Sequence, residues 1–286
     1  MKLLTIADKP ATIAITALIS ICALLLHMFE TSTTTVTKAA SPILTISLFL
    51  LGIGYIYSIR VRLENIALRN ISKIFWEINQ IYRTKLSELF NSSTATPLTR
   101  ENIILASEEQ TLKAVCQRIE TIFRTLINRN CMVTIKLVTM EEGRYCAKTY
   151  VRSQDLSERD DNNTETYHVG SGKNTGFDIA LSKRDDGLPP HFFSPDLSNC
   201  EQYLNERDDY LRFYRSTILV PISNNSRNDS TLSDVIGFLS VDTLSKNRLN
   251  NSNHLYMLSA LSSQMYNFIS LLRGKYIISA NGSENE

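Results

Sequence analysis

The sequence 215-RSTILVPI-222 is followed, after a polar segment, by 235-VIGFLSVD-242. Both runs are rich in β-branched side chains, which is typical of β-strands, and the hydrophilic residues 223–233 between them are typical of an exposed hairpin tip. We therefore expect strands at 216–222 and 234–242. The second run has apolar residues on both faces of the expected strand, which predicts a strand near the centre of a sheet.

A second pair of predicted strands precedes the first. Residues 131–140 alternate and are rich in β-branched side chains, and residues 145–151 form another run of the same kind. Glu142 and Gly143 lie between the two runs and are typical of a tight turn. These residues predict a β-hairpin.

Amphipathic helices are predicted on both sides of the strands. Apolar residues recur at helical spacing over 112–126, up to a turn signal at 128–130, and again over about 253–272. Residues 177–181 predict a short helix in the irregular middle segment. The order helix, two strands, irregular segment, two strands, helix predicts an α+β fold with an antiparallel sheet.

The closing half of this arrangement resembles a GAF domain. GAF domains show a strand that ends in Val-Pro-Ile, as at 220–222, then an exposed hairpin, an apolar strand of the Ile-Gly-Val-Leu type, as at 236–239, and a helix that packs on the sheet. The resemblance covers about 112–272, with its distinctive motifs in the second half. It implies a GAF-like antiparallel sheet flanked by helices, in a domain that we place at 99–275.

The resemblance also implies a sensory module rather than an enzyme. GAF domains bind cyclic nucleotides, tetrapyrroles or other small molecules in a pocket between the sheet and the irregular middle segment. Neither the Asn-Lys-Phe-Asp-Glu signature of cyclic-nucleotide-binding members nor a bilin-attachment cysteine is found, and Cys200 lacks the neighbouring histidine. The resemblance therefore names no ligand or cofactor.

Three residues of the motifs have a structural interpretation. Pro221 is expected to end a strand where its missing N–H is not needed. Gly237, inside an apolar strand, is expected to permit the close approach of a packed helix or a ligand. Asp242, at a strand end, is expected to accept hydrogen bonds from turn amides.

The irregular segment and the start of the next strand hold the candidate ligand site. Its aromatic residues could line an apolar cavity, its arginines and a serine could hold an anionic group through charge-assisted hydrogen bonds, and Asp196 could orient one arginine. The alternative is that the aromatic residues belong to the core and the arginines to the surface. The candidate residues are Phe177, Phe192, Phe193, Asp196, Arg212, Tyr214, Arg215 and Ser216.

Residues 170–175, Gly-Ser-Gly-Lys-Asn-Thr, look like a phosphate-binding loop but do not fit its pattern. Tyr167 occupies the position of the first glycine, and Asn174 occupies the position of the Ser or Thr after the lysine. We therefore expect a flexible loop at the edge of the pocket, in which the glycines tolerate positive φ.

Nothing in the sequence favours catalysis. The histidines at 168, 191 and 254 are far apart and lack metal-ligand spacing, and the tandem acids at 185–186 and 208–209 are typical of solvated loops. We expect no enzyme activity and no metal site, although a triad assembled in space stays open because triads are defined by geometry. The net charge of +1 disfavours a nucleic-acid polymer as partner.

Two apolar stretches without charged residues, 11–29 and 42–59, lie near the start of the chain. Each has about the length that a helix needs to cross a bilayer, so residues 1–59 are predicted to form a transmembrane hairpin. Lysines and arginines gather before the first stretch and after the second. By the positive-inside rule, both termini then lie in the cytoplasm, with the two spans in the inner membrane.

Two alternatives to the hairpin stay open. A cleaved signal peptide would place the soluble part outside the cytoplasm, and a buried core hairpin would need no bilayer. The cysteines favour the cytoplasm, because the five of them are scattered and odd in number and form no disulfide framework or close-spaced zinc pair.

Residues 60–98 are predicted to form a connecting helix and a linker. The helix over 60–90 contains no Gly or Pro and has a wide apolar face, so we expect it to pair with a second copy in a homo-oligomer while also contacting its own domain. A purely intramolecular role stays open, because two heptads do not prove a coiled coil. Ser, Thr and Pro97 mark the linker. Residues 276–286 are expected to be a disordered tail.

The sequence therefore predicts a membrane-anchored, GAF-like sensory or regulatory protein. It would bind a small molecule, a nucleotide or a partner signalling protein in the cytoplasm and relay that event through an oligomerising helix. The alternative is a ligand-activated membrane-disrupting effector of a bacterial antiphage defence system, with the transmembrane hairpin as its output.

Overall fold

The chain divides into two units, Met1–Lys73 and Ile74–Glu286, in a computed structural model. The unit boundary falls within a helix. The structure describes residues 35–91, 97–154, 166–182, 186–224, 234–249 and 252–282. Side chains are described within 46–88, 105–154, 166–182, 186–224, 234–249 and 252–273.

The order of elements follows the predicted α+β pattern. The helices and strands are α2 (Thr35–Asn91), α3 (Pro97–Ile127), β1 (Met132–Glu141), β2 (Arg144–Arg152), β3 (Thr166–His168), α4 (Thr175–Leu181), β4 (Phe192–Ser194), β5 (Ser216–Ser223), β6 (Val235–Thr243) and α5 (Ser252–Gly282). The strands β3 and β4 were not predicted, because three residues are too few to show an alternating pattern.

In the N-terminal unit, the described part of α2 is one uninterrupted helix. Among the described residues, one helix, from Ile46 onward, is long and apolar enough to cross a membrane by length and composition. Its large apolar side chains are exposed, with Leu51 at 70% and Tyr55 at 69%. The predicted second span therefore lies in this helix. The predicted first span, 11–29, and the orientation of the N-terminus lie outside the described residues.

The helix α2 begins earlier than the sequence predicts. Thr35–Ser41 are helical, although they were expected to belong to the connection between two spans. The helix former Ala occupies two consecutive positions there, and Pro42 removes only one backbone donor, that for the carbonyl four residues before it. At the other end, α2 stops at Asn91 and α3 starts on Pro97, a residue suited to the first position of a helix.

The C-terminal unit is built on a six-stranded antiparallel sheet of strand order β3-β2-β1-β6-β5-β4. The apolar strand β6 lies between β1 and β5, which confirms its predicted central place. Glu142 and Gly143 have φ angles of 50° and 76° and join β1 to β2 in a two-residue turn. Positive φ at both positions is the geometry that suits the twist of a tight hairpin.

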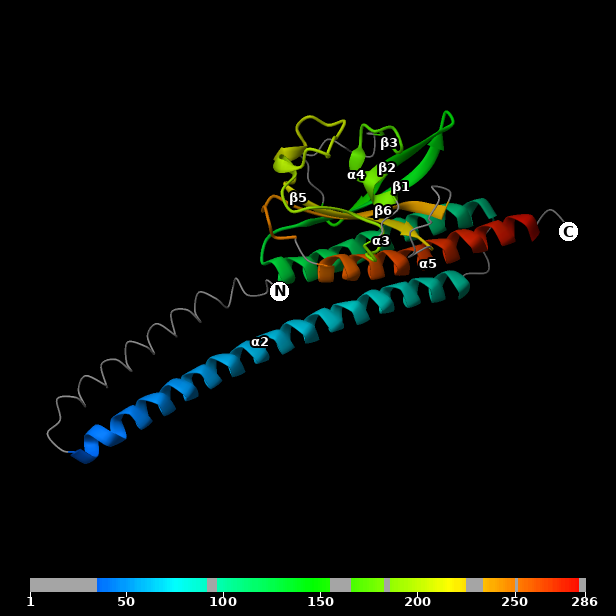
Figure 1. Cartoon of the computed structure of the whole chain (residues 1–286). Coiled ribbons are helices and arrows are strands. Elements are labelled where there is room, and N and C mark those ends of the chain that lie inside the picture. Colours follow the sequence, from blue (N-terminus) through cyan, green and yellow to red (C-terminus); the bar gives the residue numbers. More distant parts are fainter. Residues whose placement is uncertain are drawn as a thin grey trace. The chain divides into compact units, whose positions relative to one another are not determined.

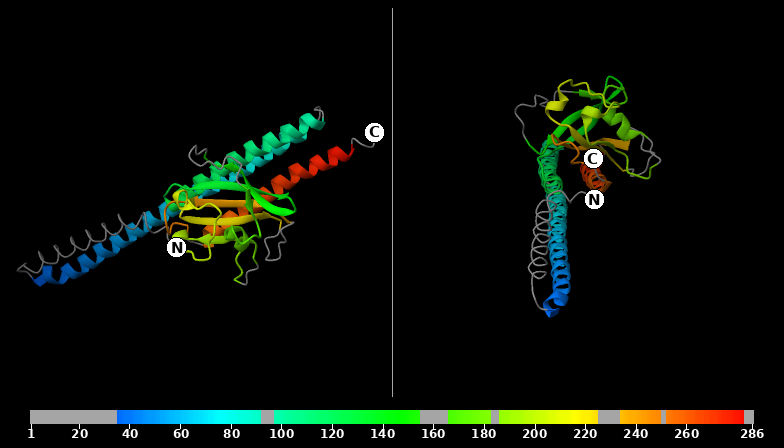
Figure 2. Two further views of the ribbon diagram at one scale, coloured as in Figure 1. Left: turned by 90° about the horizontal axis from the view of Figure 1, so that it is seen from above. Right: turned by 60° about the vertical axis from the view of Figure 1, so that its left-hand side comes forward.

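Two helices cover one face of this sheet, and α4 lies on the other (Figure 1). The view from above in Figure 2 shows α5 passing beneath the strands and α3 running beside it. Buried apolar side chains of α3, α5 and the strands fill the space between the helices and the sheet. The fully buried ones include Leu112, Ile119, Phe123, Ile135, Ile218, Ile222, Leu239 and Leu258.

Pro221 and Gly237 have different neighbours from those expected. Pro221 does not end its strand, because β5 runs on to Ser223, and its carbonyl oxygen accepts a hydrogen bond from Ser262 Oγ of α5 at 2.6 Å. Gly237 lies against the backbone of the neighbouring strand β1. A Cβ at this position would collide with the carbonyl oxygen of Lys136 on β1, so glycine is needed for the pairing of the two central strands.

The helix α5 also differs from the prediction at its end. It continues through Gly282, whereas 276–286 were expected to be disordered. Glycine within a helix costs only about 1 kcal/mol, so Gly274 does not end it. Residues 283–286 lie outside the described residues.

The buried face of α3 gives the first prediction. Phe123 is completely buried, so Phe123→Ala is expected to lower the free energy of unfolding by about 3–5 kcal/mol through lost burial and a residual cavity. Leu126→Ala, at a half-buried position of the same helix, is expected to cost about 1 kcal/mol. Urea unfolding of the detergent-solubilised chain, followed by circular dichroism, measures both. Equal losses would contradict the burial of this face.

Candidate functional site

A cavity lies between the sheet and the layer formed by α4, β4 and the segment that follows it. Its volume is about 60 Å³ for the centres of water-sized molecules. One water needs about 10–15 Å³ on this scale, so the cavity holds several waters or one compact ligand.

The floor of the cavity is polar, although it is formed by the middle of a sheet. It includes Thr134 and Lys136 of β1, Arg152 of β2, and Ser240 and Asp242 of β6. The strand register brings these side chains together, because Thr134 lies opposite both Arg152 and Ser240. The other set of alternating positions in the same strands is apolar and faces α3 and α5.

A β-bulge in β2 lets Thr149 and Arg152 face the cavity side of the sheet together. Ile135 pairs with Val151 and Lys136 pairs with Thr149, so Tyr150 is the extra residue. Thr149 and Arg152 can then face the same side, which residues three apart in a regular strand cannot do.

The hydroxyl of Thr149 confirms that geometry. Lys136 Nζ donates a hydrogen bond to Thr149 Oγ1 at 2.7 Å, and Arg152 Nη2 donates to the same oxygen at 3.4 Å. Lys136 Nζ also lies 4.0 Å from the centroid of the Tyr167 ring, in a cation–π contact. The bulge therefore builds a cationic pole in the cavity.

Asp242 forms the opposite pole. Its carboxylate accepts hydrogen bonds from Thr217 Oγ1 at 2.6 Å and from Ser240 Oγ at 3.3 Å, and the residue is only 6% exposed. These donors are side-chain hydroxyls of the sheet and not the turn amides expected from the sequence. The sheet alternation turns Asp242 to the cavity face together with Ser240.

Aromatic side chains form the roof. The rings of Phe192 and Tyr203 stack with centroids 5.2 Å apart, and the hydroxyls of Tyr203 and Tyr214 lie 3.1 Å apart. Asn205 Nδ2 donates to both hydroxyls, at 2.8 Å and 2.7 Å. Burial raises the pKa of Tyr203 to about 12, although its hydrogen bonds with Tyr214 and Asn205 act in the opposite direction. Tyr203 therefore stays protonated at neutral pH.

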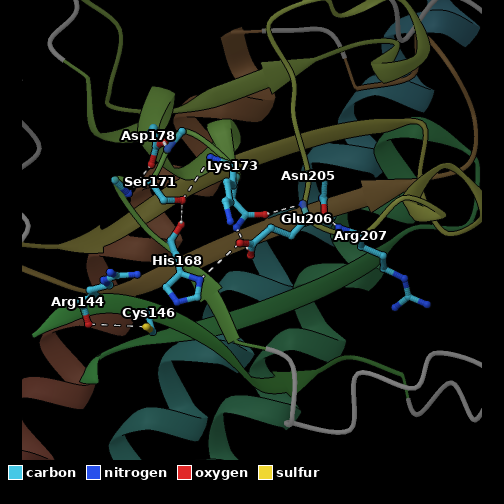
Figure 3. A network of polar contacts seen from close by, with 12 residues as sticks. Arg144, Cys146, His168, Ser171, Lys173, Asp178, Asn205, Glu206 and Arg207 are labelled. Atoms are coloured by element: carbon cyan, nitrogen blue, oxygen red, sulfur yellow. Dashed lines mark hydrogen bonds and ion pairs between the residues drawn. The ribbon is translucent and has the colours of Figure 1, made fainter. Parts of the chain in front are cut away.

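A hydrogen-bonded edge joins the roof to the sheet (Figure 3). Asn174 Nδ2 donates to Glu206 Oε2 at 2.7 Å, and the backbone N–H of Glu206 donates to Asn174 Oδ1 at 3.1 Å. His168 Nδ1 lies 3.5 Å from the other carboxylate oxygen of Glu206. These contacts hold the start of α4 against the segment that carries Tyr203 and Asn205.

The backbone amides of the glycine-containing loop 170–175 bind a carboxylate of the same chain. Gly170 and Gly172 both have positive φ, and their N–H groups donate to the two carboxylate oxygens of Asp178 at 2.7 Å and 3.0 Å (Figure 3). A carboxylate of the same chain therefore occupies the place where a phosphate would bind in a phosphate-binding loop. This arrangement agrees with the rejection of that motif from the sequence.

Phe177, Phe192 and Tyr214 are the three candidate residues that border the cavity. Phe193 follows Phe192 in β4 and is not among the residues of the lining. Ser216 Oγ donates to the carbonyl oxygen of Ser194 at 3.1 Å, beneath β4.

The structure does not bring the charged candidates to the cavity. Arg212 is 77% exposed and lies 3.8 Å from Asp209. Arg215 is exposed, and its backbone bonds to Thr243 and Leu197. Asp196 pairs with Lys246 at 3.0 Å, and hydrogen bonding by Ser198 lowers the pKa of its carboxyl.

Sequence reasoning missed Lys136, Arg152 and Asp242 as cavity residues. The alternation of 131–140 holds a signal for Thr134 and Lys136, because they are polar residues at every second position of a buried strand. No comparable signal exists for Arg152, whose direction depends on the bulge. The anion-binding arginines were sought in the irregular segment, whereas the cations lie on the sheet.

The residues described offer no metal site, and two buried thiols outside the cavity lining are unreactive. Among the residues described, no three His, Cys, Asp or Glu side chains gather as a metal site would require. Burial raises the pKa of the Cys131 thiol to about 12 and raises the pKa of Cys116 further. Both thiols are therefore protonated and unreactive at neutral pH.

No protein-family model matches the chain, and no curated protein is significantly similar to it. Among solved structures, it is similar to the blue-light-absorbing form of the PixJ GAF domain of Thermosynechococcus elongatus, with 15% identity, a TM-score of 0.41, and coverage of 62% of this chain and 94% of that one. It is also similar to the GAF domain of the Acinetobacter phosphoenolpyruvate-protein phosphotransferase, with 13% identity, a TM-score of 0.39, and coverage of 73% of this chain and 96% of that one. A third similar structure is the type II free methionine-R-sulfoxide reductase of Thermoplasma acidophilum, with 14% identity, a TM-score of 0.39, and coverage of 59% of this chain and 96% of that one. These values support no conclusion about a ligand or an activity.

The bonds between the amides of loop 170–175 and the Asp178 carboxylate give the second prediction. Asp178→Asn is expected to lower the free energy of unfolding by about 1 kcal/mol, because an amide nitrogen cannot accept the bond from one of the two glycine N–H groups. Lys173→Ala, at an exposed position of the same loop, is expected to change it by less than about 0.5 kcal/mol. Thermal unfolding with and without ATP measures both effects. Stabilisation by ATP that Lys173→Ala abolishes would show that the loop binds phosphate after all.

Proposed function

We propose that this chain is a membrane-anchored sensory or regulatory protein, in which a small molecule binds the cavity and changes the packing of the helices beneath the sheet. The observation that carries this proposal is the bulge in β2. It lets Thr149 and Arg152 share the cavity side of the sheet, where Thr149 bonds to two cations of the cavity lining, and turns Tyr150 towards the helices. A rearrangement of the floor would therefore move a residue on the opposite face.

Tyr150 contacts the helices through an ion pair whose carboxylate is buried. Its hydroxyl donates a hydrogen bond to Glu108 of α3, a residue with no exposed surface. Glu108 Oε1 in turn lies 3.0 Å from Arg273 Nη2 of α5. Glu108 is fully buried, so loss of Arg273 would leave its carboxylate without this partner, and α3 and α5 are expected to follow Tyr150 together.

The helices also contact the C-terminal part of α2. The rings of Tyr82 in α2 and Phe268 in α5 have centroids 4.6 Å apart, and Arg118 of α3 lies 3.3 Å from Glu77. We propose that these contacts carry the change to α2, and that residues 60–90 pair with a second copy. Exposed apolar side chains such as Leu68 and Trp76, both at 61%, support that pairing.

The membrane arrangement is part of the same proposal. The exposed apolar helix of the N-terminal unit supports one span. A second span at 11–29, with both termini in the cytoplasm and the hairpin in the inner membrane, is supported by the distribution of lysines and arginines in the sequence. We propose no catalytic step, because the cavity presents a protonated Tyr203 and no activated nucleophile among the described residues.

Tyr150→Phe tests the relay. It removes one hydroxyl on the helix side and leaves the cavity residues unchanged. A metabolite that raises the melting temperature of the full-length protein by binding the folded state is expected to do so in the variant as well. Trp76, the sole tryptophan, reports on α2, and its fluorescence change on ligand addition is expected to fall at least twofold in the variant.

Tyr256→Phe is the matched control, because Tyr256 is a half-exposed tyrosine of α5. This substitution should leave both the ligand-induced rise in melting temperature and the Trp76 fluorescence change as they are in the wild type. An unaltered Trp76 response in Tyr150→Phe would contradict the relay. A metabolite panel without any stabilising compound would contradict the sensory role. Ligand-dependent leakage from vesicles that contain the protein would instead favour the membrane-disrupting effector.

A further inference from the structure

We infer that the cavity binds a compact carboxylate with a hydrogen-bond donor on the adjacent carbon, that is, a small 2-hydroxy or 2-amino acid. This inference rests on the proposed sensory function and adds the chemical class of its ligand. It is carried by three features of the floor: a cationic pole, an acidic pole, and a buried hydroxyl between them whose oxygen has no partner.

The cationic pole suits a carboxylate. Lys136 and Arg152 converge on Thr149 Oγ1, at 2.7 Å and 3.4 Å, so their charged groups are close to each other. Arginine with lysine is a combination that recognises carboxylates and phosphates. The charged side chains of the cavity lining are Lys136, Arg152 and Asp242. A carboxylate monoanion suits this set better than a phosphate dianion, which Asp242 would repel more strongly.

The acidic pole suits a donor on the same ligand. Asp242 lies on β6 and Arg152 on β2, with β1 between them. Neighbouring strands are about 4.8 Å apart, so the two strands are separated by roughly 10 Å at the backbone. The volume of about 60 Å³ limits the ligand to a compact molecule.

Thr134 lies between the poles and provides the independent observation. It is 3% exposed and borders the cavity, opposite Arg152 on one side and Ser240 on the other. Its Oγ1 has no hydrogen-bond partner among the residues described. A buried hydroxyl left in this state is costly, and a ligand oxygen or nitrogen placed between the poles would satisfy it.

The test uses the unaltered full-length protein in detergent and four probes in calorimetric titrations: L-lactate, L-alanine, propionate and inorganic phosphate. Lactate or alanine is expected to bind. Propionate, which lacks the donor, is expected to bind at least about tenfold more weakly, because a hydrogen bond to a charged group is lost. The lactate and alanine arms distinguish a hydroxyl donor from an ammonium donor.

Two variants locate the binding. Valine has the shape of threonine without its hydroxyl, so Thr134→Val is expected to weaken binding of the preferred probe by about fivefold. It should not lower the melting temperature of the ligand-free protein. Lys136→Gln is expected to weaken it by about 10- to 100-fold. Thr139→Val and Lys148→Gln are the matched controls, because both residues lie on the same hairpin outside the cavity lining. They should bind as the wild type does.

The outcomes separate this inference from the proposed function. Tighter binding of phosphate or propionate than of lactate and alanine overturns the inference, as does wild-type affinity in Thr134→Val. Binding of neither lactate nor alanine also overturns it, while the sensory function stands if another metabolite stabilises the protein and changes Trp76 fluorescence. Binding of lactate or alanine without any Trp76 change supports the inference and counts against the relay.

Discussion

Burial of both faces of one antiparallel sheet is the constraint on which the rest of the C-terminal unit depends. The face that contacts α3 and α5 is apolar, and its burial supplies the main stabilisation of the fold. The opposite face carries Lys136, Arg152 and Asp242 beneath a layer of aromatic rings. Burying polar and charged groups is costly unless each one finds a partner. The hydroxyls of Thr149, Thr217 and Ser240 supply such partners, and the cavity leaves room for others.

The sequence predicts the apolar face better than the polar one. Strands β5 and β6, the Glu142-Gly143 turn and the buried positions of α3 follow from local periodicity, because each repeats a pattern over several residues. The short strands β3 and β4 do not, because they form only through pairing with β2 and β5. The same limit applies to Gly237, whose role depends on the backbone of a strand about a hundred residues away in sequence.

The candidate site shows the same division. Phe177, Phe192 and Tyr214 could be placed at the cavity from sequence because aromatic residues in an irregular segment usually cover a core. The choice of Arg212 and Arg215 as anion-binding residues assumed that the charged groups also lie in that segment. The cations come instead from strands, and one of them faces the cavity because of a bulge. A bulge depends on how two strands pair, so the sequence of β2 alone does not reveal that Arg152 and Thr149 share a face.

The bulge gives the fold a physical link between two layers that a regular strand would keep independent. In a regular strand, residues 150 and 152 would share one face and residue 149 would lie on the other, so Thr149 and Arg152 could not both face the cavity side. With Tyr150 as the extra residue, Thr149 and Arg152 share the cavity side of the sheet, and the hydroxyl of Tyr150 bonds on the other side to Glu108, the buried member of the Glu108–Arg273 pair. Because a bulge disrupts the ladder locally, β2 is less regularly paired at this point than on either side of it, which makes this point the proposed site of a shift. Because Glu108 is buried and paired with Arg273, the relay proposed above has α3 and α5 move together in response to such a shift.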